Sequence, residues 1–335
     1  MSDRQQKKQS QIADLTVKYW KKWDYRWNIL SVVVVVAALL ENLFVPAQEL
    51  VDNTVYRYFL VIYGLYLIGI YLYGRFVSFK AHFYAGHFAQ LNTIIGILLL
   101  GQDLLTEKFA RFTLPFFVSF AQILDQIRED HQLLWESTES SLVLWLVSFI
   151  IGTLIGVGLG LAMGRYRQAN YWAFPFLKVI GIIPAAAWMP LTMILFPTSY
   201  SAEVFLIVFS VWFPVAFMTI GGVQGIPTAY FESAHTLGFS EWRIIRKVVI
   251  PGAMPSIFIG IYTALGLSFM TLVISEMMGA KVGLGWYINW AKGTGNYTQV
   301  YASIAIMALL FSIIFSLLTT VQEKVLRWRD NSTGI

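Results

Sequence analysis

Long apolar runs separated by short polar segments dominate the chain. Each run has about the 20 residues that a helix needs to cross roughly 30 Å of hydrocarbon. Apolar residues follow one another within the runs and do not alternate with polar ones, which indicates helices and not barrel strands. We expect spans at 29–45, 56–74, 88–105, 139–163, 171–196, 202–223, 254–278 and 299–320. The third is the weakest, because Gln90, Asn92, Gln102 and Asp103 dilute it. The pattern predicts an all-α polytopic membrane protein.

Composition and charge agree with this fold class. Hydrophobic residues make up 57% of the chain and charged residues 13%, whereas a soluble domain carries about 25% charged residues. The chain has no cysteine, which excludes disulfides, thiolate metal sites and cysteine nucleophiles. The net charge of +5 comes from basic residues at the ends of the apolar runs. Such charges set membrane orientation, so we expect a lipid bilayer and no nucleic acid as partner.

The placement of lysine and arginine predicts how the chain crosses the membrane. Most of the 24 basic residues lie in the segments 1–28, 75–87, 164–170, 224–253 and 321–335. The positive-inside rule then places both termini in the cytoplasm of a bacterial-type cell, with the chain in its inner or plasma membrane. Residues 1–28 form a basic cytoplasmic segment in this interpretation. Val45-Pro46-Ala47 loosely resembles a signal-peptidase site, but the polar leader before it is long, so we keep 29–45 as a span.

Glycines recur every four residues on the span 139–163, at Gly152, Gly156, Gly160 and Gly164. This spacing puts them on one helix face, where two backbones can approach closely. We expect a helix-packing seam. A nucleotide-binding interpretation of the run Gly156-Val157-Gly158-Leu159-Gly160 is not favoured, because the run lies inside an apolar span with no strand before it.

Prolines and one acidic residue mark a candidate solute pathway. Pro184 and Pro190 lie inside the span 171–196, on either side of Trp188. They predict either a packing kink or a broken helix that flexes and lines a pathway. Glu276 lies well inside the span 254–278 and either binds substrate or pairs across a helix interface. The four histidines lack metal-site spacing and no nucleophile–base pair stands out, so we expect no metal, no catalytic residue and no enzyme.

The segment 224–253 carries the most specific pattern. Pro227 suits the first turn of a short helix over 227–237, and Gly238 supplies a left-handed residue to end it. Ser240 can cap a second short helix, which Pro251 ends before the next span. A helix–glycine–helix element in the cytoplasm is suited to fit a groove on another protein.

This segment resembles the coupling loop of binding-protein-dependent ABC permeases, on the spacing of Glu232, Ala234, Gly238 and Pro251. Ser233 replaces the usual middle alanine. The resemblance is closest to the nitrate/sulfonate/taurine branch. It implies a type I importer permease core of about six helices over 88–335, with an extra transmembrane helix pair at 29–80. One departure concerns the segment 181–185, Gly-Ile-Ile-Pro-Ala, where many members carry Arg-Pro-Ile-Pro-Pro.

The resemblance also implies a set of partners. The loop 224–253 docks a separate ATPase, present in two copies, and a second permease completes a homodimer or heterodimer. An extracytoplasmic substrate-binding protein delivers a small solute, such as nitrate, a sulfonate, taurine or a related molecule. The chain has no phosphate loop, so ATP is expected on the partner and no cofactor on this chain. An ion-coupled secondary transporter is the alternative, but it predicts several intramembrane ionisable residues, and Glu276 is the one clear candidate. A membrane-embedded enzyme or a scaffold protein explains the loop less well.

Overall fold

The computed structural model describes residues 26–47, 52–76, 79–109, 111–112 and 117–327. Regular structure within these ranges is entirely helical. The chain divides into two compact units. Unit 1 runs to His131 and includes residues 295–302, and unit 2 contains residues 132–294 and the chain from Ser303. Each unit is described by itself.

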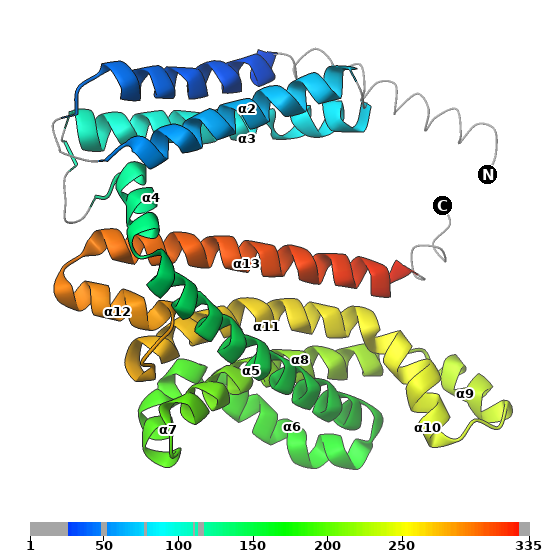
Figure 1. Ribbon diagram of the computed structural model, residues 1–335. Helices are drawn as coiled ribbons and strands as arrows, with labels where there is room; N and C mark the ends of the chain where they lie inside the picture. The colour runs from blue at the N-terminus through cyan, green and yellow to red at the C-terminus, as the bar shows by residue number, and fades with distance from the viewer. Residues whose placement is uncertain (1–25, 48–51, 77–78, 110, 113–116, 328–335) are drawn as a thin grey trace, which may run out of the picture. The chain divides into compact units, whose positions relative to one another are not determined.

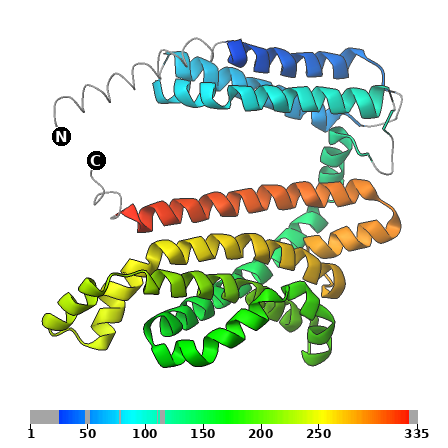
Figure 2. The same ribbon diagram turned by 180° about the vertical axis from the view of Figure 1, so that it is seen from behind.

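Three helices lie side by side in unit 1: Arg26–Phe44, α2 (Thr54–Phe76) and α3 (Phe79–Asp103) (Figures 1 and 2). A π-helical turn, Leu104–Lys108, extends α3, and α4 (Phe120–Glu129) follows. Their shared core consists of Val35, Ala38, Tyr56, Leu60, Leu67, Leu99 and Ala121. At the start of α4, the Ser119 hydroxyl accepts a bond from the Gln122 N–H at 3.1 Å, and Gln122 Oε1 accepts one from the Ser119 N–H at 2.9 Å. This capping box fixes where α4 begins.

Buried polar side chains gather at one end of the three-helix bundle. Asn42 Nδ2 donates to Asp103 Oδ2 at 3.1 Å, and Asn53 Nδ2 donates to Glu107 Oε2 at 2.9 Å. Lys108 Nζ donates to the Val45 carbonyl at 2.8 Å. The polar residue Asp103, which weakens the third span in the sequence pattern, is therefore paired across helices within this unit.

Unit 2 is built around α8 and α11, which lie against each other along their length (Figures 1 and 2). Its helices are α5 (His131–Arg165), α6 (Arg167–Ile182), α7 (Met189–Leu195), α8 (Ser199–Gln224), α9 (Thr228–Thr236), α10 (Glu241–Ile244), α11 (Ile250–Gly279), α12 (Leu284–Thr294) and α13 (Tyr297–Val325). A 3-10 turn, Ala185–Trp188, precedes α7, and a π-helical turn, Ile245–Val249, precedes α11. Trp145 of α5, Val211 of α8 and Leu265 of α11 are central to the core. The first residues of α13, up to Ala302, belong to unit 1.

The eight predicted spans correspond to helices of the structure. Seven helices in the described part of the chain are long and apolar enough to cross a membrane. The eighth is a bent pair, Arg167–Ile182 with Ala185–Leu195, which turns by 87°. The predicted all-α polytopic class is thereby confirmed.

Two details differ from the sequence analysis. The span 88–105, which was grouped with the permease core, packs in unit 1 with the first helix and α2. Pro251 was predicted to end a separate helix, and this is wrong: the helical segment Glu241–Gly279 runs on through 39 residues. Pro251 stands in the first turn of α11, directly after the π-helical turn Ile245–Val249, so its missing N–H coincides with a change in the helical hydrogen-bond pattern.

Candidate functional site

α9 and Gly238 form the first half of the loop that the sequence singled out. The helix begins at Thr228, after Pro227, and ends at Thr236, with Leu237 as its C-cap. Gly238 has a φ of 69°, which is the left-handed region that glycine adopts most readily. The Phe239 N–H donates to the Ala234 carbonyl at 3.0 Å, and the Gly238 N–H donates to the His235 carbonyl at 2.9 Å. These bonds close the end of α9. The predicted short helix and its glycine stop are thus present in the structure.

The motif residues of α9 divide between two faces. Glu232 and Ser233 are exposed, and the Ser233 hydroxyl donates back to the Ala229 carbonyl at 2.8 Å. Ala234 is buried in a cluster with Ile244 of α10, Val249 of the π-helical turn and Ala253 of α11. A small residue at 234 lets α9 lie close to the rest of unit 2, while the Glu232 side chain is exposed.

Arg165, the last residue of α5, joins α9 and α10 to the rest of unit 2. Its Nη2 atom lies 3.0 Å from Glu241 Oε1 and 3.2 Å from Glu241 Oε2. Its guanidinium carbon lies 5.2 Å from the centre of the Phe231 ring on α9. The sequence analysis did not single out this contact, because Arg165 and Glu241 are 76 positions apart and neither carries a motif.

Pro251 lies beside a second feature of the loop, a cavity of about 360 Å³ between α9 and the start of α11. Pro227 and Tyr230 line it from the α9 side, and Lys247, Pro251 and Gly252 line it from the other. In both views, α9 and α10 project from the end of unit 2 that is opposite to α7 and α12 (Figures 1 and 2).

The four glycines of α5 all lie against α8. An added Cβ would come within 2.7 Å of Val211 Cβ at Gly152, 2.8 Å of the Trp212 carbonyl at Gly156 and 2.5 Å of Thr219 Cβ at Gly160. At Gly164 it would lie 2.6 Å from Val223 Cβ. Only glycine allows the two backbones to approach this closely. Gly158, on another face of α5, has open space around it.

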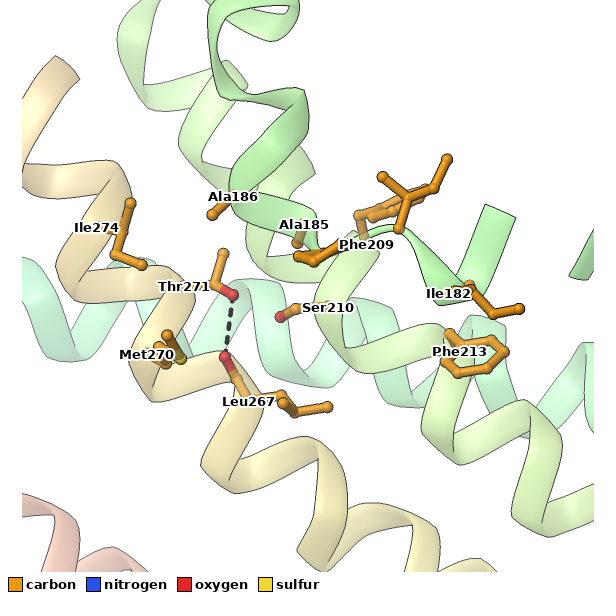
Figure 3. A pocket seen from close by; sticks show the side chains of 13 residues that line it. Ile182, Ala185, Ala186, Phe209, Ser210, Phe213, Leu267, Met270, Thr271 and Ile274 are labelled. Atoms are coloured by element: carbon orange, nitrogen blue, oxygen red, sulfur yellow. Dashed lines mark hydrogen bonds between the residues drawn. The ribbon is translucent and has the colours of Figure 1, made fainter. Parts of the chain in front are cut away.

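The break between α6 and α7 opens a cavity of about 280 Å³ in unit 2 (Figure 3). α6 ends at Ile182, and the chain turns at Pro184 into the 3-10 turn. The residues that line the cavity are Gly181, Ile182, Ile183, Pro184, Ala185, Ala186, Phe209, Ser210, Phe213, Leu267, Met270, Thr271 and Ile274. Pro184 is therefore at the cavity. Trp188 and Pro190 are not among its lining residues, and the Trp188 ring packs 5.7 Å from the Phe209 ring, measured between centroids.

Two hydroxyls are the polar side-chain groups of this cavity. Ser210 Oγ donates to the Ile207 carbonyl at 2.7 Å, and Thr271 Oγ1 donates to the Leu267 carbonyl at 2.9 Å (Figure 3). The remaining lining side chains are aliphatic, aromatic or thioether, and none of the lining residues is charged.

Glu276 lies apart from the cavity lining and is only 1% exposed. Its Oε1 accepts a hydrogen bond from the Ser141 hydroxyl at 2.6 Å, and its Oε2 accepts one from the Gly285 N–H at 2.8 Å. Ser141 Oγ in turn accepts the Leu284 N–H at 2.8 Å. Of the two alternatives for Glu276, the geometry corresponds to pairing, because the carboxylate ties α5, α11 and the start of α12 together. Glu203 of α8 is also buried, and the sequence analysis missed it because it stands at the edge of its span.

A bundle of apolar helices with a broken span at a cavity and a protruding short helix is the architecture of a membrane transport subunit. A model of the family described as the binding-protein-dependent transport system inner membrane component matches residues 152–328, and the chain belongs to this family. The matched segment includes the glycine seam from its first glycine, the cavity and the whole of α9. The resemblance based on Glu232, Ala234, Gly238 and Pro251 is confirmed, as is the nitrate/sulfonate/taurine branch.

Curated relatives illustrate the range of this branch. The putative aliphatic sulfonates transport permease protein SsuC of Bacillus subtilis is 30% identical over 188 residues, which is 56% of this chain and 68% of the relative. The bicarbonate transport system permease protein CmpB of Synechococcus elongatus is 33% identical over 210 residues, 62% of this chain and 72% of the relative. A solved amino acid ABC transporter covers 59% of this chain and 97% of its own, with a TM-score of 0.50 and 17% identity, and so supports the fold.

Proposed function

We propose that this chain forms the translocation pathway of an ATP-driven importer and takes its energy from a separate ATPase that docks on α9. The observation that carries this proposal is the protruding α9, with Glu232 exposed on it, Ala234 anchored in unit 2 and Gly238 closing it. A short helix held in this way is a rigid contact that a partner can push or pull as one body.

The contacts of α9 indicate how its movement reaches the membrane helices. Arg165 joins α9 and α10 to the end of α5. Along α5, the glycine seam holds the helix against α8 at backbone distance. A displacement of α9 therefore acts on the α5–α8 pair, and α8 lines the cavity through Phe209, Ser210 and Phe213. The proposed cycle is a two-state change, in which ATP-driven closure of the partner favours one arrangement of these helices over the other.

The proposed importer has further subunits besides this chain. ATP binds to two copies of the partner ATPase and not to this chain. A second permease, identical or related, completes the pathway, and an extracytoplasmic binding protein delivers a small solute. Both termini and α9 face the cytoplasm of a bacterial-type cell, as the distribution of basic residues predicts.

Substitutions on α9 test this function. In the complex reconstituted with its ATPase and binding protein, we expect Glu232→Lys and Gly238→Val to abolish solute uptake and to weaken co-purification of the ATPase. The transmembrane helices should remain folded, as measured by helical circular dichroism. Ser233→Ala is the matched control on the same exposed surface, and it should leave uptake unchanged. Retained ATPase binding together with retained uptake in both test variants would show that α9 is not the docking element.

A further inference from the structure

The cavity at the α6–α7 break offers acceptors to a bound solute, and its side chains offer no free donor. The hydroxyls of Ser210 and Thr271 each have one proton, and each proton is already donated to a carbonyl of its own helix. Their oxygen lone pairs remain able to accept a hydrogen bond. An anion needs donors or positive charge, and no lining side chain supplies either. The backbone N–H groups of Ala185 and Ala186 precede the first bonded N–H of the 3-10 turn, that of Ala187, and two neutral donors do not offset a full buried charge.

The Phe213 ring occupies the space that a side chain at position 181 would need. A Cβ added at Gly181 would collide with the Phe213 ring. In this chain the space beside the α6–α7 break is therefore aromatic and uncharged, with Phe209 as a second ring in the lining and Met270 across from α8 on α11.

Burying an ion without compensating charge or hydrogen bonds costs far more free energy than burying an apolar group of similar size. Given the pathway function proposed above, we propose that the solute is an uncharged organic molecule with an apolar or aromatic body. A hydroxyl or amide N–H on the solute donates to Ser210 and Thr271. This class differs from the sulfonate and the bicarbonate that appear in the names of the two relatives.

The absence of cysteine from the chain allows a direct test of the cavity. Met270→Cys places one thiol at an exposed lining position, and Ser210→Cys places one at a near-isosteric position on the opposite wall. Each variant, as the full chain in nanodiscs, is reacted with three methanethiosulfonates: neutral benzyl, anionic sulfonatoethyl and cationic trimethylammonioethyl. Rates are divided by those of Thr236→Cys, an exposed position on α9.

We expect the normalised rate for the neutral reagent to exceed that for the anionic reagent by at least about tenfold at both positions. Equal rates, or a faster anionic reaction, would overturn the proposal. In the Met270→Cys background, Gly181→Arg combined with Phe213→Ala should remove this preference, whereas Phe213→Ala alone should keep it. Because this measurement needs neither the ATPase nor the binding protein, its outcome is separate from the uptake test of α9.

Discussion

Arg165 at the end of α5 forms an ion pair with Glu241 at the start of α10, with 3.0 Å between Nη2 and Oε1. The Glu241 side chain is 53% exposed, so the pair contributes only about 0.2–1 kcal/mol to stability. The pair is important for its position and not for its strength, because the same guanidinium lies over the Phe231 ring of the proposed docking helix.

Reversing one charge of this pair should uncouple transport without unfolding the protein. We expect Arg165→Glu to lower uptake by up to about fivefold, since loss of the pair and repulsion from Glu241 weaken the contact of α9 with α5. The double variant Arg165→Glu with Glu241→Arg should restore most of the uptake. ATP hydrolysis and uptake measured on the same reconstituted complex would separate coupling from docking. Equal loss in the single and double variants would show that the pair does not position α9.

The α5–α8 seam predicts a sharp difference between two neighbouring glycines. Gly160→Ala places a Cβ against Thr219 and the Ala216 carbonyl, and we expect it to destabilise the protein by roughly 1–3 kcal/mol. Gly158→Ala meets open space and should be neutral or stabilising by up to about 1 kcal/mol, because alanine favours the helix. Unfolding in detergent mixtures, followed by circular dichroism, measures both. Similar losses in the two variants would contradict the seam.

Ser141 should contribute more to the stability of the protein than Ser137, which lies one turn earlier on α5. Ser141→Ala removes the acceptor of the Leu284 N–H and a donor to Glu276, and it should cost about 1–3 kcal/mol. The Ser137 hydroxyl is buried without a hydrogen-bond partner in the described structure, so Ser137→Ala should be neutral or slightly stabilising. Thermal unfolding of the two variants makes the comparison. A neutral Ser141→Ala would mean that Glu276 does not depend on this bond.

The left-handed conformation of Gly238 predicts an order among its replacements. Gly238→Asn should retain most coupling, because asparagine tolerates a positive φ, whereas Gly238→Val adds about 1–2 kcal/mol of local strain. No atom would lie within 4 Å of a Cβ added there, so crowding within this chain does not contribute. ATPase stimulation by the loaded binding protein is the measurement. If both variants lose coupling equally, the partner requires the absence of a side chain at position 238 and does not depend on its φ.

Features set by local sequence were predictable. Apolar run length alone gave the eight spans, and Pro184 indicated the break that the structure shows as an 87° bend. Gly238 and Pro227 marked the two ends of α9. Proline by itself is a weaker signal: Pro214 remains inside the continuous α8, and Pro251 follows a π-helical turn that the sequence did not reveal.

Contacts between distant segments were not predictable in the same way. Ser141 and Glu276 are 135 positions apart, and their bond exists only once α5, α11 and α12 have packed. The same holds for Asp103, whose polarity weakened the third span while its partner Asn42 lay 61 positions away. Hydropathy along the sequence registers the free-energy cost of a polar residue inside a span, but it does not identify the distant partner that offsets this cost.

The buried polar end of unit 1 has a consequence for biogenesis. A charged residue near the middle of an isolated apolar helix costs roughly 2.5–3.5 kcal/mol on entering lipid, and less near the helix end. Asn42 of the first helix is bonded to Asp103 of α3, and Asn53, directly before α2, is bonded to Glu107 in the π-helical turn that extends α3. Each helix is therefore more stable in the bilayer when it is packed with the other two than when it is alone. The three should leave the insertion machinery as a set, with the third helix stabilised in the bilayer by the two made before it.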